Sequence, residues 1–300
     1  MDSTMKQDAI RPAEFPSGVK LSPGNGGLPK LQISCPQAEG EIYLHGAHLT
    51  SWKPAGARDV LWVSQKSMWE SGKPIRGGVP ICFPWFGPKK DDPSAPIHGF
   101  VRLREWRLDG VTTEQDAIVV ALSLNGDDST KRWWPHDFRA RMRVAFGSRL
   151  IMSLEVENSG DAAFSFEEAL HTYFGVADVR QIEIPALDGH DYIDKADRLA
   201  EKKQQGAVRI SAETDRVYLN AVKPVEIRDP AMHRRIRVTK QNSNETVVWN
   251  PWVAKAKAMP DFGDDEWIGM ICVEACNALS SSVQLAPSAL HTMTAIVEQH

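Results

Sequence analysis

Large apolar side chains recur at every second position along much of the middle of the chain. This pattern runs from Ile118 to Leu124, from Met142 to Phe146 and from Leu150 to Val156. Successive side chains of a β-strand point to opposite faces, so a period of two predicts strands with one buried face. Turn-forming residues at 125–128 and 158–160 separate these runs. The middle of the chain is therefore predicted to form consecutive strands joined by short turns.

Helical periodicity is scarce elsewhere. Further strands are expected at residues 181–184, 235–239, 245–249, 268–274 and 291–298. Short helices are expected only near 196–204 and 67–72. Strands without regular intervening helices argue against a parallel βαβ design. The chain is therefore predicted to be all-β, an antiparallel sandwich of roughly ten or more strands.

The chain is expected to form one main domain preceded by a short leader. Residues 1–28 are rich in proline, glycine and polar residues, and are expected to form a loose leader. Residues 29–300 contain no internal repeat and are expected to form a single sandwich domain. The first residues lack the basic and then apolar order of a signal peptide, and no apolar run reaches the length of a membrane span.

Composition and charge narrow the possible ligands. The chain has 300 residues, 42% hydrophobic and 25% charged, with a net charge of −4. This charge offers no field for nucleic acid or an anionic membrane, so an anionic ligand would need local arginines. We expect a cytoplasmic monomer whose four cysteines are free thiols. Cys272 and Cys276 lie four apart without a second Cys/His cluster, so no zinc site is expected.

Two loop segments carry candidate binding residues. Arg76 precedes two glycines, which would let the backbone approach a ligand that the guanidinium grips. Trp85 lies in a loop bounded by proline and glycine, where an aromatic face could stack on a sugar. His98 and Arg102 flank a Gly-Phe pair. The alternatives are a surface-turn arginine, a core tryptophan and a structural histidine.

Two predicted strands carry candidate acid–base residues. His171 lies in an apolar run, where a histidine is more often a satisfied core residue than a catalyst. Glu274 ends the long apolar run that begins at Trp267. A carboxylate is rarely buried without a partner or a task, so Glu274 is either a salt-bridged structural residue or a general base with a raised pKa.

Seven segments, taken in order, resemble the glucose-6-phosphate 1-epimerase, or hexose-6-phosphate mutarotase, branch of the aldose 1-epimerase superfamily. They are residues 44–52, 76–80, 98–102, 170–174, 214–218, 249–252 and 273–275. The resemblance runs from about residue 30 to the C-terminus. No single segment is decisive, but seven in the same order are specific.

The resemblance implies a galactose-mutarotase-like β-supersandwich and an acid–base ring opening of a sugar phosphate without metal or cofactor. It places the family's catalytic pair on His171 and Glu274, with Glu274 as base and His171 as acid. Arg76 and Arg102 match phosphate- and sugar-binding positions, and Asp215 matches a further substrate contact. Some members carry glutamine where this chain has Ile97, so His98 is the nearest polar substitute.

Three other functions stay open on the sequence. The first is a mutarotase of unphosphorylated aldoses, which the two arginines argue against. The second is a glycoside hydrolase, in which Glu167 or Glu168 would pair with Glu274. The third is a non-catalytic carbohydrate-binding sandwich.

Overall fold

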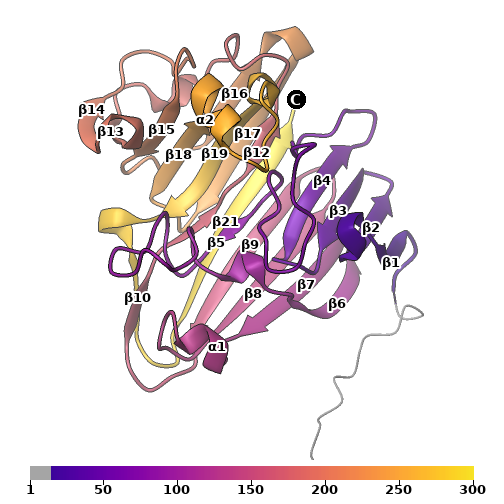
Figure 1. Ribbon diagram of the computed structural model, residues 1–300. Coiled ribbons are helices and arrows are strands. Elements are labelled where there is room, and N and C mark those ends of the chain that lie inside the picture. The colour runs from indigo at the N-terminus through magenta and orange to yellow at the C-terminus, as the bar shows by residue number, and fades with distance from the viewer. Residues whose placement is uncertain (1–14) are drawn as a thin grey trace, which may run out of the picture.

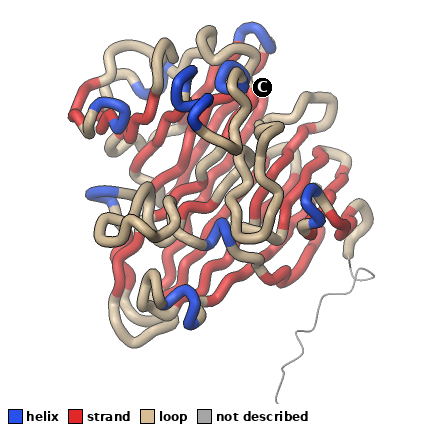
Figure 2. The backbone as a smooth tube through the Cα atoms, in the orientation of Figure 1, coloured by secondary structure: helices blue, strands red, loops and turns tan. Residues whose placement is uncertain are grey.

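A computed structural model describes residues 15–300 and is built almost entirely from antiparallel strands (Figures 1 and 2). One sheet has seven strands in the order β16-β17-β21-β9-β8-β7-β6. Its strands are β6 (Arg107–Glu114), β7 (Ala117–Asn125), β8 (Phe138–Phe146), β9 (Leu150–Asn158), β16 (Val225–Asp229), β17 (Arg234–Gln241) and β21 (Leu290–Gln299). The alternation seen in the sequence is the alternation of buried and exposed residues along β8 and β9.

A second sheet of eight strands has the order β14-β13-β15-β18-β19-β11-β5, and β12 also pairs with β19. Its strands are β5 (Ile81–Cys82), β11 (Glu168–Leu170), β12 (Tyr173–Gly175), β13 (Asp191–Asp194), β14 (Ala200–Lys203), β15 (Thr214–Tyr218), β18 (Glu245–Asn250) and β19 (Met270–Asn277). Every residue of β18 and β19 is buried. These strands therefore form the centre of the molecule, with both of their faces covered.

The remaining strands form a four-stranded sheet and a two-stranded ribbon. They are β1 (Val19–Pro23), β2 (Pro29–Cys35), β3 (Ala38–Tyr43) and β4 (His48–Pro54), with β10 (Phe164–Phe166) and β20 (Val283–Leu285) in the ribbon. The indigo four-stranded sheet lies beside the seven-stranded sheet (Figure 1), where the indole of Trp52 donates a 3.2 Å hydrogen bond to the carbonyl of Gly147. Phe83, directly after β5, packs against the seven-stranded sheet and the ribbon, since its ring lies 5.3 Å from that of Phe138 in β8 and 5.2 Å from that of Phe166 in β10.

Helices are few and short (Figure 2). The α-helices among the described residues are α1 (Asp128–Lys131) and α2 (Trp252–Ala258). Single 3₁₀ turns are Asn25–Gly27, Val101–Leu103, Pro185–Leu187, Lys195–Asp197, Pro230–Met232, Glu266–Gly269 and Leu279–Ser281. Among these residues no helix combines the length and the apolar character needed to cross a membrane.

Four details differ from the sequence predictions. The predicted leader contains β1, which pairs with β2, so the sheet begins at residue 19, while residues 1–14 lie outside the described part. Residues 67–72 form turns and bends without a helix. The third difference concerns the strands predicted at 181–184 and 268–274, since residues 181–184 make only isolated bridges and β19 begins at residue 270, after a 3₁₀ turn.

The fourth difference is the helix expected near 196–204, which is a 3₁₀ turn followed by strand β14. The carboxylate of Asp194 accepts a hydrogen bond from the amide of Ala196 and caps the turn. Arg198 and Leu199 then adopt left-handed φ values of 51° and 63°, which end any helix. Residues 200–203 pair with β13 instead.

Candidate active site

A cavity of about 610 Å³ opens over the eight-stranded sheet. Loops that precede β5 and β6 line one side of it, and strands β15, β18 and β19 form its floor. Six of the seven residues singled out from the sequence line this cavity, namely Arg76, His98, Arg102, His171, Asp215 and Glu274. Residues that are 198 positions apart in sequence therefore meet in one place.

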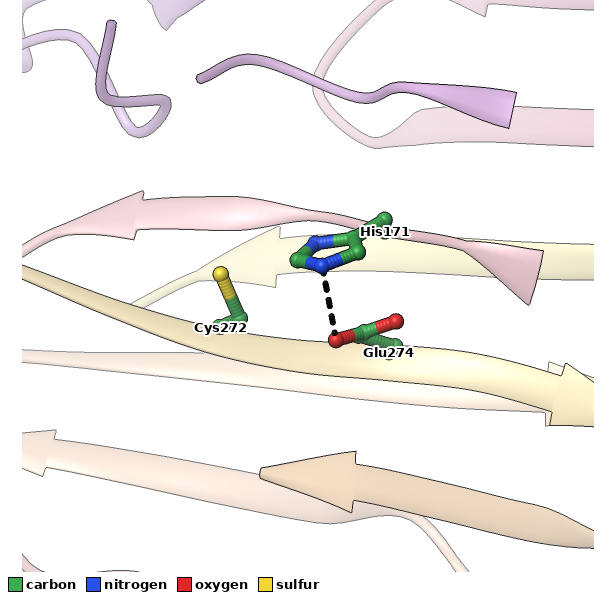
Figure 3. Close-up of side chains that lie close together, drawn as sticks. All are labelled: His171, Cys272 and Glu274. Carbon is green, nitrogen blue, oxygen red and sulfur yellow. Dashed lines mark ion pairs between the residues drawn. The ribbon is translucent and has the colours of Figure 1, made fainter. Parts of the chain in front are cut away.

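Strand register brings His171 and Glu274 together. Leu170 pairs with Ala275 and Tyr173 pairs with Cys272, so β11 and β12 keep one register along β19. That register sets His171 directly opposite Glu274, and opposite side chains of an antiparallel pair lie on the same face. The imidazole Nε2 is 3.3 Å from the Oε1 of Glu274 (Figure 3).

The same register places further side chains in line with His171 and Glu274 across the sheet. Val247 of β18 is the neighbour of Glu274 on its other side. Two residues along, Asp215, Trp249, Cys272 and Tyr173 follow one another across β15, β18, β19 and β12. Because side chains two apart in a strand share a face, both rows point toward the cavity.

The side chains of His171 and Glu274 are almost fully enclosed. Only 7% of His171 and 1% of Glu274 is exposed. Neither the Nδ1 of His171 nor either carboxylate oxygen of Glu274 has a hydrogen-bond partner among the described residues. A charged group in this environment loses hydration without compensation.

Burial moves the two pKa values in opposite directions. It raises the pKa of Glu274 well above its ordinary value, and the nearby carboxylate of Asp215 raises it further. It lowers the pKa of His171 well below its ordinary value, and Arg102 and Arg76 lower it further. Both shifts favour the uncharged forms, a protonated carboxyl group beside a neutral imidazole. This is the reverse of the protonation that a glutamate base and a histidine acid require.

Aromatic rings fix the orientation of the imidazole. The ring of Tyr173 stacks on His171 at 4.8 Å, while Trp249 and His98 meet it edge-on at 5.9 Å and 5.6 Å. The Tyr173 hydroxyl accepts a 3.1 Å hydrogen bond from Arg76. Arg76 is thus linked to His171 through one aromatic side chain.

The two arginines are held differently. Arg76 forms an ion pair with Asp261 in which its Nη2 is 3.0 Å from a carboxylate oxygen. Gly78, two residues later, has a φ of 58°, and a Cβ there would lie 2.1 Å from the carbonyl oxygen of Leu49. Arg102 is 9% exposed, and its Nη2 donates to the carbonyl of Ile97 at 2.7 Å. Its Nε has no partner among the described residues, so Arg102 lacks a counter-ion.

His98 and Trp85 have different positions. The Nδ1 of His98 accepts a 3.0 Å hydrogen bond from the amide of Gly87, so its neutral ring carries the proton on Nε2. Burial, and then Arg102, lower the pKa of His98 well below its ordinary value, so it stays neutral. Trp85 is not among the residues that line the cavity. Its indole donates to the carbonyl of Pro96 at 2.9 Å and its ring packs against Phe100.

Sequence reasoning missed several residues that line the cavity. Lys195 lies 3.7 Å from the carboxylate of Asp215 and 4.6 Å from the centre of the Phe86 ring. Lys255 of α2 also lines the cavity and pairs with Glu213 at 2.8 Å. Nothing in the local sequence around Lys195 indicates a site, since that stretch is expected to be helical. Trp249 lies in one of the seven resembling segments, which is the one signal that could have found it.

One group could bind a metal ion. The ligand atoms of His171, Cys272 and Glu274 all lie within 4.8 Å of one another (Figure 3). Zinc bonds of 2.0–2.3 Å would need donors about 3.3–3.8 Å apart, so the group would have to contract. Burial also raises the pKa of the Cys272 thiol well above its ordinary value, which opposes the thiolate that zinc requires. The geometry is closer to a proton-transfer pair beside a thiol.

Sequence comparisons connect this cavity with sugar epimerases. The model of the aldose 1-epimerase family matches residues 29–297. An Escherichia coli K12 protein with the provisional name glucose-6-phosphate 1-epimerase is 36% identical over 252 residues, which are 84% of each chain. A Cenchrus ciliaris protein with the same provisional name is 37% identical over 257 residues, covering 82% of this chain and 77% of the relative.

Solved structures agree with the sequence relatives. A provisionally assigned mutarotase from Salmonella typhimurium superposes with a TM-score of 0.88 at 31% identity, over 95% of this chain and 94% of that chain. A galactose mutarotase related enzyme from Lactobacillus acidophilus has a TM-score of 0.72 at 15% identity, over 90% and 97% of the two chains, and shares the fold. The predicted galactose-mutarotase-like sandwich is confirmed.

Proposed function

Since this chain belongs to the aldose 1-epimerase family, we propose that it interconverts the α and β anomers of a hexose 6-phosphate, with glucose 6-phosphate as the preferred substrate. The observation that carries the proposal is the buried pair of His171 and Glu274 in one cavity with Arg76 and Arg102. His171 and Glu274 carry out the proton transfers, and the two arginines favour a substrate that carries a phosphate.

The reaction needs one acid and one base. A base removes the proton from the anomeric hydroxyl while an acid protonates the ring oxygen, and the bond between C1 and the ring oxygen breaks. The open aldehyde rotates about C1–C2 and closes on its other face, with the two roles reversed. The pair ends with the same single proton with which it began, so the step balances without a further reactant.

The geometry supports an assignment of the two roles. The phosphate of the substrate is carried on C6, next to the carbon that bears the ring oxygen, so the ring oxygen is the reacting oxygen nearest the phosphate. His171 is linked to Arg76 through the Tyr173 ring, whereas Glu274 lies toward Asp215. His171 is therefore the acid at the ring oxygen in the ring-opening direction, and Glu274 is the base at the anomeric hydroxyl.

Arg102 favours a phosphorylated substrate. Its guanidinium is buried beside one carbonyl, without a carboxylate partner. A neutral hexose would leave that charge unpaired, at a cost of several kcal/mol. A phosphate would pair with it through charge-assisted hydrogen bonds, and the Nε2–H of neutral His98 lines the same cavity as a further donor.

The first test is anomer exchange by NMR on freshly dissolved α-glucose 6-phosphate. His171→Asn and Glu274→Gln should each lower kcat by about 10²–10⁴ while the dissociation constant changes by only a few-fold. Glu201→Gln, on exposed strand β14, is the matched control and should retain full activity. Wild-type protein that does not exceed the buffer rate would contradict the proposal and favour a binding module. Release of reducing ends from oligosaccharides would favour a hydrolase.

We also infer a monomeric protein that works in the cytoplasm. All four cysteines are unpaired, and three of them are buried, as expected for a protein made in a reducing compartment. Sedimentation at micromolar concentration tests the oligomeric state, and fractionation of cells tests the location.

A further inference from the structure

Cationic side chains surround the acid–base pair. Arg76, Arg102 and Lys195 line the same cavity as His171 and Glu274. Arg76 already has Asp261 as a partner, and Lys195 lies near Asp215, but within residues 15–300 the partner of the Arg102 side chain is the Ile97 carbonyl and no carboxylate pairs with it. The cavity therefore holds positive charge that is not fully compensated, next to a buried imidazole.

The charged and titratable groups that face His171 come from six parts of the fold. They are Arg76, His98 and Arg102 from the loops, Tyr173 from β12, Lys195 from the turn after β13, Asp215 from β15, and Cys272 and Glu274 from β19. Arg102, Arg76 and Lys195 each oppose a proton on His171. For Glu274 the charges with the largest effects are those of Asp215, Lys195 and Arg102.

This arrangement creates a difficulty for catalysis. Ring opening requires a protonated acid at the ring oxygen, but the burial of His171 and the cations that share its cavity disfavour an imidazolium and leave the proton favoured on Glu274. The site must transfer the proton across the 3.3 Å contact from the carboxyl group to the imidazole. That transfer creates an imidazolium next to the arginines and a carboxylate next to Asp215, so both products are disfavoured in the ligand-free protein.

A dianion bound among the cations would remove the first part of this difficulty. We propose that the phosphate of the substrate activates the catalytic pair as well as anchoring the sugar. It pairs with Arg102 and offsets the field of Arg76, so that His171 accepts the proton of Glu274. A free oxyanion in the same cavity then supports turnover of an unphosphorylated hexose. The proposal rests on the proposed function and adds an anion-dependent activity to it. The proton moves within the pair, so no other reactant is consumed.

The test is mutarotation of α-glucose in the presence of phosphite. Phosphite dianion lacks the sugar and mimics only the phosphate group of the substrate. Rates are followed by NMR at constant ionic strength, with enzyme-free blanks subtracted because oxyanions catalyse mutarotation in solution. We expect saturable acceleration of about tenfold or more over enzyme without phosphite, since each unit by which the pKa of His171 rises gives about ten times more imidazolium. Chloride at the same ionic strength should have no effect.

Variants connect the effect to the cavity. Arg102→Met should abolish phosphite activation, and His171→Asn should abolish it as well. Because Arg102 is buried and its variant could fail to fold, Lys195→Met provides a second, less buried change that should weaken activation. On wild-type protein, ¹⁵N spectra of labelled histidine should show His171 gaining a proton when phosphite binds.

The outcomes separate this inference from the proposed function. If the protein turns over glucose 6-phosphate but phosphite gives no acceleration of glucose mutarotation, the phosphate is only an anchor and the inference is wrong. Activation that persists in Arg102→Met also overturns it. If glucose 6-phosphate itself is not turned over, the proposed function is wrong, whatever the phosphite experiment shows.

Discussion

The side chains of Glu274 and His171 are placed where the charged form of each is disfavoured. Neither residue could be assigned from its local sequence, because an apolar strand with one histidine or one glutamate is usually structural. Only the order of the seven segments made them the candidate catalytic pair. For Trp85 the local sequence did suggest a role, a sugar contact from a loop. Its ring instead packs against Phe100.

The shifted pKa values predict how stability depends on pH. The pKa of Glu274 is raised from its ordinary 4.5, so above pH 4.5 the folded state holds a proton that the unfolded chain has lost. Stability therefore falls as pH rises toward the folded pKa, by up to about 1.4 kcal/mol per pH unit. Glu274→Gln removes this loss, so its stability relative to wild type should increase from pH 5 to pH 8 in urea unfolding.

His171→Asn provides the complementary measurement. The pKa of His171 is lowered from its ordinary 6.5, so its contribution to stability is complete above pH 6.5 and declines as pH falls. This variant should gain stability relative to wild type on acidification, with a slope opposite to that of Glu274→Gln. Parallel slopes for the two variants would contradict the opposite pKa shifts.

At the scale of elements, the acid–base pair is a consequence of strand register. The period-two pattern predicts that strands exist, but register depends on long-range pairing that a single sequence does not specify. Once β11 and β12 align with β19, His171 must face Glu274. The missed helix at 196–204 has the same cause, since pairing with β13 outweighs local helical preference.

Gly99 provides a test of how the binding loop is held. Its φ is 72°, and a Cβ would lie 1.8 Å from the carbonyl oxygen of Phe83, which accepts a hydrogen bond from Phe100. Gly99→Ala should therefore separate the loop from β5, displace His98 and Arg102, and cost more than the roughly 1–3 kcal/mol of backbone strain alone.

Gly56→Ala is the matched control. Its φ is 73°, but nothing lies within 4 Å of the added Cβ. This variant should lose only the stability that backbone strain costs, and it should retain full activity. Chemical denaturation and anomer exchange measure both effects, and equal losses in the two variants would mean that close approach to Phe83 is unimportant.

At the scale of the whole molecule, one cavity connects segments from residue 76 to residue 274. The fold class was predictable because alternation and scarce helical periodicity both indicate an antiparallel sandwich. The division into three sheets and a ribbon was not, because sheet membership depends on which distant strands pair. Lys195 and Lys255 reach the cavity only through that pairing, which explains why the sequence did not indicate them.

A ligand that contacts so many segments should stabilise the whole fold. Glucose 6-phosphate at about 100 times its dissociation constant should add about 2.7 kcal/mol to the free energy of unfolding and raise the melting temperature by several degrees. Arg102→Met should lose most of this increase at the same ligand concentration. Thermal melts with glucose at the same concentration are the comparison, and an equal shift would contradict selection for the phosphate.

The complete burial of β19 has a consequence for protein engineering. All eight of its residues are enclosed, so a replacement there that changes the size of a side chain disturbs the core. Ile97, Lys195 and Lys255 lie on loops, a turn or a surface helix at the cavity rim, where side chains can change without repacking the interior. A library aimed at new sugar specificities should therefore vary the rim and leave the central strand untouched.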